Sequence, residues 1–174
     1  MKLNEAISLI QFPPISAAGK KLWADLGSGT GLFASALARL ISPGSKIFAV
    51  DTNMASLNKI EPSATVTIEK VRADFSNGFL NFKNLDGILM ANSLHYIQDK
   101  SGFIKKLDGY LSSQGNILIV EYNTDEPNPW VPFPTSFATL QALFKNLGYS
   151  AIQKINELPS RYDHATIYAA WITR

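Results

Sequence analysis

The stretch from Leu22 to Gly31 constrains the fold more than any other, because an apolar run meets three glycines at alternate positions. After it, apolar residues recur at positions 33, 36, 37, 40 and 41, which is the spacing of one helix face. Glycine accepts positive φ and lets a ligand approach the backbone, and a helix start offers free N–H groups. The stretch therefore predicts a strand, a tight turn and a helix that bind a nucleotide-like ligand.

The residues around the glycines indicate which ligand the turn accepts. No Lys follows Gly31, which argues against a Walker-type ATP site. A dinucleotide pattern fits only as Gly29-x-Gly31-x-x-Ala34, whereas Asp25 lies two residues before the first glycine. That carboxylate opposes a pyrophosphate and favours a ligand with an ammonium group.

The pattern Asp-x-Gly-x-Gly-x-Gly resembles the first motif of the class I S-adenosylmethionine-dependent methyltransferases. In that family the acid lies near the methionine amino group, directly or through water. The resemblance implies that S-adenosylmethionine is the cofactor and S-adenosylhomocysteine the product. It also implies cofactor contacts from five residues of this stretch: Asp25, Gly27, Ser28, Gly29 and Gly31.

Asp51 ends the apolar strand predicted over residues 46–51 and lies 20 residues after Gly31. In Rossmann-like folds an acid at this position binds ribose hydroxyls, so Asp51 and the adjacent Thr52 are predicted cofactor contacts. The alternative for Asp51 is to cap a helix that starts near Asn53.

Asp74 and Phe75 follow a β-branched strand over 65–71, which is expected at an edge of the sheet. The resemblance implies that Asp74 accepts a hydrogen bond from the adenine amine and that Phe75 packs on the ring. The alternative is that Asp74 caps the turn over 76–78.

A fourth predicted strand, 85–92, runs into the sequence Asn92-Ser-Leu-His-Tyr. This resembles the motif after the fourth strand of small-molecule methyltransferases, and it differs from the Asn/Asp-Pro-Pro-Tyr/Phe motif of enzymes that methylate nucleobases or glutamine. Asn92 is therefore a predicted cofactor contact. His95 is the candidate general base, although a lone His is more often structural.

The rest of the chain alternates strands and helices, which predicts a parallel sheet with right-handed crossovers. We expect a helix over 103–111, capped by Asp99 or Ser101, and a turn over 112–115. A strand over 116–122 and a helix over 137–147, capped by residue 135 or 136, should follow. Two strands near 150–157 and 164–172 form a hairpin, with Arg161 and Tyr162 at its exposed tip. The predicted fold is an α/β, Rossmann-like, doubly wound, mostly parallel seven-stranded sheet with a C-terminal antiparallel hairpin. Residues 1–174 are expected to form a single methyltransferase domain, with 1–19 as a lid or packing segment and 20–174 as its core.

The segment 123–135 holds four prolines and follows a predicted strand, where open α/β sheets bind ligands. We expect its Trp130 and Phe133, together with Tyr96 and Tyr122, to line the acceptor site. This lining is aromatic and nearly uncharged, which predicts a small organic acceptor.

Composition excludes several classes of protein. The formal net charge of +2 argues against nucleic acid as a binding partner. The absence of cysteine excludes disulfides and thiolate catalysis. Two histidines without cysteine predict no metal site. No apolar run approaches the ~20 residues of a membrane span, so no membrane partner and a cytoplasmic location are expected.

The sequence therefore predicts an S-adenosylmethionine-dependent methyltransferase that acts by in-line displacement. Because only about 20 residues precede the first strand, a homodimer or a partner chain is a candidate to complete the acceptor site. Two alternatives stay open: an NAD(P)-dependent oxidoreductase, and a catalytically silent S-adenosylmethionine-binding subunit of a larger complex.

Overall fold

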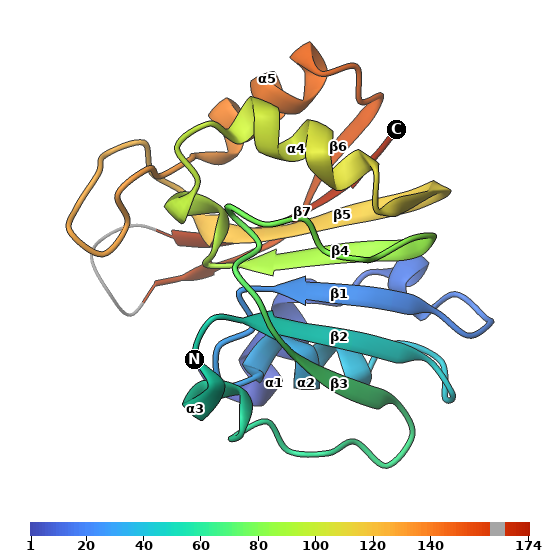
Figure 1. Cartoon of the computed structure of the whole chain (residues 1–174). Helices are drawn as coiled ribbons and strands as arrows, with labels where there is room; N and C mark the ends of the chain where they lie inside the picture. The colour runs from blue at the N-terminus through green and yellow to red at the C-terminus, as the bar shows by residue number, and fades with distance from the viewer. Residues whose placement is uncertain (161–165) are drawn as a thin grey trace.

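The computed structural model describes residues 1–160 and 166–174, where a seven-stranded sheet has the order β3-β2-β1-β4-β5-β7-β6 (Figure 1). Strands β1 to β5 pair in parallel, and β7 pairs antiparallel to both β5 and β6. This confirms the predicted fold, including the edge position of β3. The strands are β1 (Leu22–Leu26), β2 (Lys46–Asp51), β3 (Thr67–Arg72), β4 (Leu85–Ala91), β5 (Leu111–Tyr122), β6 (Ala151–Pro159) and β7 (Thr166–Thr173).

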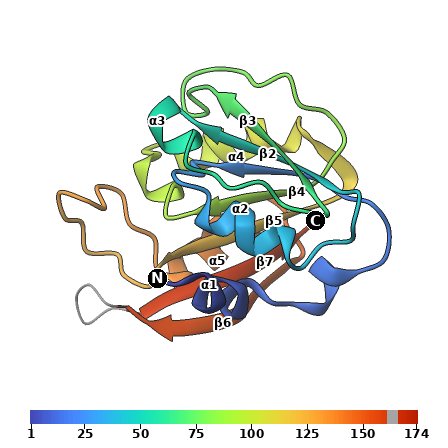
Figure 2. The ribbon, with the colours of Figure 1, turned by 90° about the horizontal axis from the view of Figure 1, so that it is seen from below.

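Helices cover both faces of the sheet (Figures 1 and 2). On one face α1 (Leu3–Ile10) and α2 (Leu32–Ala38) pack on a core that includes Trp23, Leu118 and Ile167. On the other face α4 (Lys100–Asp108) and α5 (Phe137–Asn146) pack on a separate core. The short elements are α3 (Met54–Leu57), η1 (Pro13–Ser16) and η2 (Leu94–Tyr96).

The expected helix caps are present. The Asp99 side chain accepts a hydrogen bond from the Gly102 amide at 2.9 Å at the start of α4. At the start of α5, Ser136 accepts one from the Thr139 amide at 3.2 Å. Each cap satisfies one of the amides that a helix start leaves unpaired.

Two predicted boundaries are wrong. Helix α2 ends at Ala38 and not at residue 41, because the amides of Arg39 and Leu40 bond to the carbonyls three residues before them, which tightens the chain into a turn. Strand β5 begins at Leu111, which pairs with Leu85 of β4 and does not belong to a helix face. The predicted turn over 112–115 is an irregular part of this strand, opposite the register shift between Leu85 and Gly87.

The N-terminal segment is built into the core. Ala6, Leu9 and Ile10 of α1 are fully buried. The Asn156 side-chain amide of β6 donates hydrogen bonds to the carbonyls of Ser8 and Gln11, each at 3.1 Å. The packing role expected for this segment is therefore present. Within residues 1–160 and 166–174, no helix combines the length and apolarity needed to cross a bilayer.

The predicted tip residues Arg161 and Tyr162 lie outside the described residues.

Candidate functional site

The glycine turn lies at the carboxyl edge of the sheet, between β1 and α2. The Val50 carbonyl of β2 accepts hydrogen bonds from the amides of Gly27 and Ser28 at 2.8 and 2.9 Å, which fixes the turn against its neighbour. Gly29 has a φ of 52°, in the left-handed region that glycine tolerates best.

The space around Gly29 differs from the space around its neighbours. A Cβ atom on Gly27 would lie 2.5 Å from the Ser93 Cβ, and one on Gly31 would lie 2.7 Å from the Ile60 Cγ1. Those two glycines are required by packing within the protein. A Cβ on Gly29 meets nothing within 4 Å among the described residues, so this face of the turn is open to a ligand.

Asp25 is a buried acid, 1% exposed. Neither of its carboxylate oxygens has a hydrogen-bond partner in residues 1–160 and 166–174. Burial raises the pKa of Asp25 from 3.8 to about 7; the Ala34 amide opposes the rise in part, and the charge of Asp51 adds to it. A buried carboxylate without a partner is costly, so a cationic group that reaches it gains a strong interaction.

Two other polar atoms near Asp25 are also buried without a partner in the described part of the chain: the Ser28 Oγ and the Asn92 Oδ1. Asp25 and Ser28 lie at the end of β1 and just after it, and Asn92 follows β4, which pairs with β1. From β1 the chain proceeds to β2 and β3 on one side of the sheet, and β4 and β5 lie on the other side. Open α/β sheets bind ligands at the carboxyl ends of the two strands where the order reverses in this way. The unpaired atoms, with the open face of Gly29, fit a polar ligand that carries an ammonium group.

Asp51 connects the glycine turn to the end of β2. Its carboxylate accepts hydrogen bonds from the Gly29 amide at 2.9 Å and from the Asn53 amide at 2.8 Å. The Asn53 side chain, and not Asp51, caps α3 by accepting a hydrogen bond from the Ser56 amide, so the capping alternative for Asp51 is wrong. The contact with Gly29 places the Asp51 carboxylate at the glycine turn. Each carboxylate oxygen has further lone pairs that can accept from ribose hydroxyls. Thr52 is exposed beside it.

Asp74 is exposed and caps the turn that follows β3, as the structural alternative predicted. It accepts hydrogen bonds from the Ser76 hydroxyl and amide and from the Asn77 side chain, and these hold the pKa of Asp74 below its usual range, the Ser76 hydroxyl most of all. Its neighbour Phe75 lies closer to the glycine turn, with a ring atom 3.4 Å from the position of a Cβ on Gly27. The Phe75 ring, more than the Asp74 carboxylate, is therefore poised to contact a ligand.

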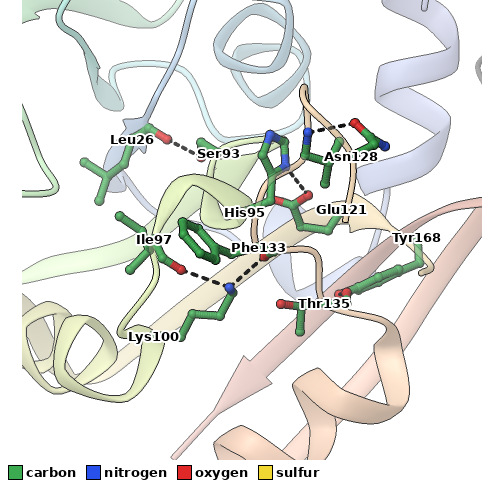
Figure 3. A network of polar contacts seen from close by, with 11 residues as sticks. Leu26, Ser93, His95, Ile97, Lys100, Glu121, Asn128, Phe133, Thr135 and Tyr168 are labelled. Atoms are coloured by element: carbon green, nitrogen blue, oxygen red, sulfur yellow. Dashed lines mark hydrogen bonds and ion pairs between the residues drawn. The ribbon is translucent and has the colours of Figure 1, made fainter. Parts of the chain in front are cut away.

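His95 is 3% exposed, and its Nδ1 lies 2.7 Å from the Oε2 of Glu121 at the end of β5 (Figure 3). The His95 amide donates to the other Glu121 oxygen at 3.2 Å. Glu121 was not predicted from the sequence as a site residue. An acid inside an apolar strand was the available signal, but its partner lies 26 residues away.

The proline-rich segment 123–135 is fixed to the residues after β4. The Phe133 amide donates to the His95 carbonyl at 3.0 Å. The Lys100 ammonium donates to the carbonyls of Phe133 and Ile97 at 2.7 and 2.9 Å (Figure 3). Desolvation lowers the pKa of Lys100, and the charge of Glu121 opposes this change. These contacts hold segment 123–135 in place against the residues that follow β4.

The predicted acceptor residues do not come together. Tyr122 lines a cavity of about 450 Å³ on the α1 and α2 face of the sheet, which Asn92 also lines. Tyr96 and Phe133 line a second cavity of about 490 Å³ on the α4 face. Trp130 is 82% exposed and lines neither cavity. In residues 1–160 and 166–174, no group of three His, Asp or Glu side chains is placed to hold a metal ion.

Comparisons with known proteins agree with this arrangement. A family profile described as a methyltransferase domain matches residues 24–119, more than half of the chain. A search of curated proteins finds no match. Among solved structures, the YcgJ protein from Bacillus subtilis has a TM-score of 0.71 at 15% identity, over 98% of this chain and 99% of that one.

Two further solved structures carry a description of activity. A SAM-dependent methyltransferase from Archaeoglobus fulgidus has a TM-score of 0.72 at 16% identity, over 98% of this chain and 93% of that one. Magnesium protoporphyrin IX methyltransferase from Synechocystis with bound SAM has a TM-score of 0.68 at 14% identity, over 97% of this chain and 77% of that one. At these identities the structures establish the shared fold, and the family profile establishes the family. The chain therefore belongs to the methyltransferase domain family and is a class I S-adenosylmethionine-dependent methyltransferase.

Proposed function

We propose that this enzyme transfers a methyl group from S-adenosylmethionine to a small organic acceptor. One observation carries the proposal: the buried oxygens of Asp25, Ser28 and Asn92, unpaired within the described residues, belong to the same edge of β1 and β4 as the glycine turn, where Gly29 is open. When bound, S-adenosylmethionine supplies a methyl group already activated on a sulfonium, so the protein mainly has to orient two molecules.

Different residues of the site contact different parts of the cofactor in this proposal. Asp25 receives the ammonium group, and Ser28 and Asn92 offer hydrogen bonds to the same polar end. Asp51 accepts hydrogen bonds from the ribose, with Thr52 beside it, because its carboxylate already faces the Gly29 amide at 2.9 Å. The Phe75 ring packs on the adenine, and Asp74 reaches the adenine only if it exchanges a contact with the Ser76 turn. Chain segments 1–19 and 20–174 act together as one domain, since α1 is part of the core.

His95 serves as a positioning residue in this proposal and not as the general base. Its Nδ1 is engaged by Glu121, its carbonyl holds Phe133, and it lines neither cavity. A base is needed only when the acceptor carries a proton at the working pH.

Calorimetry with S-adenosylmethionine, S-adenosylhomocysteine and NAD tests the proposal. We expect both sulfur compounds to bind and NAD to bind more weakly or not at all. Tighter binding of NAD than of either would refute it. Methyl transfer to a panel of acceptors then separates an active enzyme from a silent binding subunit.

A matched pair of variants locates the cofactor. Gly29→Val places a β-branched side chain in the open space at a φ of 52°, and Gly148→Val does so at the end of α5, where φ is 85° and the space is also open. Both variants carry backbone strain of about 1–2 kcal/mol, but only Gly29→Val should abolish binding of S-adenosylhomocysteine. Retained binding in Gly29→Val would place the cofactor elsewhere.

A further inference from the structure

The cavity of about 450 Å³ is enclosed by parts of the chain that are far apart in sequence. Its walls come from α1, from the start of α2, from the ends of β4 and β5, and from the β6–β7 hairpin. The side chains that matter most for what it can hold are Leu32, Phe33, Tyr122, Leu158 and Ile167, together with Glu5, which is the contribution of α1. Four of these six are aliphatic or phenyl groups, so a molecule in the cavity meets mostly apolar surface, with one carboxyl group on the α1 side.

The cavity begins where the cofactor turn ends. Leu32 and Phe33 directly follow Gly31, and Asn92, whose unpaired oxygen belongs to the proposed cofactor site, also lines the cavity. A molecule here would therefore lie against the methionine end of the cofactor.

The second cavity lies on the opposite face of the sheet. It is lined by Ser76 and Asn77, next to the residues proposed to face the adenine, and by α4. The two cavities thus flank the glycine turn at different ends of the proposed cofactor. Because the reactive methyl group is attached to the methionine sulfur, the cavity on the α1 and α2 face is the better placed of these two to present an acceptor to it.

We propose that the cavity between α1, α2 and the β6–β7 hairpin is the acceptor site and that it takes an apolar ring system of one or two fused rings. The proposal rests on the methyltransferase function proposed above and names the class of its substrate. The volume of about 450 Å³ is near the lower end of the range of small-molecule pockets, about 300–1,000 Å³. Asn92, just after β4, and Tyr122, at the end of β5, add polar side chains to the lining at the carboxyl edge of the sheet, where the proposed cofactor lies. The nucleophilic oxygen or nitrogen of the acceptor is expected on that side.

The walls of the cavity are fixed before a ligand arrives. Asn156 ties β6 to two carbonyls of the α1 segment. Glu157, on the same strand, accepts hydrogen bonds from Lys154 at 2.6 Å and from the Asn123 side chain at 2.8 Å. These contacts hold the pKa of Glu157 at about 2, with the Lys154 ammonium as the largest cause. A preformed apolar site binds a rigid ring with little ordering cost.

The test uses 2-naphthol, an uncharged molecule of two fused rings, as the probe. Calorimetry measures its binding to the full chain saturated with S-adenosylhomocysteine. Leu158→Trp enlarges a half-buried side chain in the cavity wall and should weaken 2-naphthol binding at least tenfold. Gln153→Trp adds the same ring to an exposed position on the same strand, outside both cavities, and should leave the binding unchanged.

Two further measurements keep the result interpretable. Binding of S-adenosylhomocysteine to each variant shows that the cofactor site and the fold survive, and its loss in the wild type would count against the proposed function itself. Tyr96→Ala changes the other cavity and should leave 2-naphthol binding unchanged. The acceptor proposal is overturned if wild-type protein that binds S-adenosylhomocysteine does not bind 2-naphthol. It is also overturned if Leu158→Trp has no effect, or if Tyr96→Ala is the variant that loses binding.

Discussion

Replacing Asp25 with an asparagine should stabilise the free protein while it weakens the cofactor complex. Asp25 is buried without a hydrogen-bond partner in the described residues, and its pKa rises from 3.8 to about 7 on folding. The native state therefore holds the Asp25 proton more tightly than the unfolded state does. Between pH 3.8 and about 7, unfolding becomes easier as the pH rises, and above pH 7 the full cost of the buried charge is present.

The magnitude follows from the size of this shift. One pKa unit corresponds to about 1.4 kcal/mol, so a shift of roughly three units costs the wild type about 4 kcal/mol at pH 8. At pH 5 the same shift costs about 2 kcal/mol, because most of the titration window lies above that pH. The side-chain amide of the Asp25→Asn variant cannot ionise, so the stability advantage of this variant should grow by about 2 kcal/mol from pH 5 to pH 8.

Urea unfolding of both proteins at the two pH values measures this difference without ligand. Glu61→Gln removes an exposed carboxylate and should show no such growth. At pH 8, calorimetry should show that Asp25→Asn binds S-adenosylmethionine at least tenfold more weakly, since the ammonium group loses a charged partner. Equal pH dependence of wild type and Asp25→Asn would refute the buried-charge argument, and unchanged affinity would refute the assigned contact.

Three other variants test separate parts of the site. Asp51→Ala should weaken S-adenosylhomocysteine binding at least tenfold in calorimetry, because each charge-assisted hydrogen bond is worth about 1.5–3 kcal/mol. Unchanged affinity in folded protein would mean that Asp51 only orders the backbone at Gly29 and Asn53. Glu121→Ala leaves two buried His95 donors unpaired, at about 1–3 kcal/mol each, so it should lower the free energy of unfolding in urea far more than Glu121→Gln, which keeps an acceptor. Equal losses in the two variants would contradict the role assigned to the Glu121 carboxylate. Trp130→Ala, at an 82% exposed position, should change stability by less than about 0.5 kcal/mol and leave 2-naphthol affinity intact, whereas a loss of that affinity would restore Trp130 to the acceptor wall.

The sequence predicted the parts of this molecule that depend on local pattern. The order of strands, the glycine turn and the helix caps follow from apolar spacing, glycines and capping residues that lie within a few positions of one another. The strand start at Leu111 was missed because its pairing partner, Leu85, lies in another strand and the intervening Ser-Ser-Gln-Gly has the composition of a turn.

The features of the site that escaped prediction depend on contacts between distant residues. Glu121 meets His95 across 26 positions, and the contact of Asn156 with Ser8 spans 148. Tyr96, Tyr122 and Trp130 are all aromatic, but they do not lie together. Tyr122 and Tyr96 line cavities on opposite faces of the sheet, and Trp130 is exposed to solvent. Periodicity indicates which residues are buried, but it does not show which buried residues meet.

The insertion of β7 between β5 and β6 affects how the chain folds during synthesis. Strand β5 carries four consecutive buried apolar residues, from Ile117 to Val120, and its second neighbour, β7, follows it and β6 in the sequence. Until β7 is added, one edge of this apolar strand has no backbone partner, which is the kind of surface on which nascent chains aggregate. Helix α1 packs mainly on α2, and the rest of its apolar face is covered when β6 and β7 are added. The cavity of about 450 Å³ is therefore complete only after β6 and β7 have joined α1 and α2, and a chain that stops before β6 would have the glycine turn without this cavity beside it.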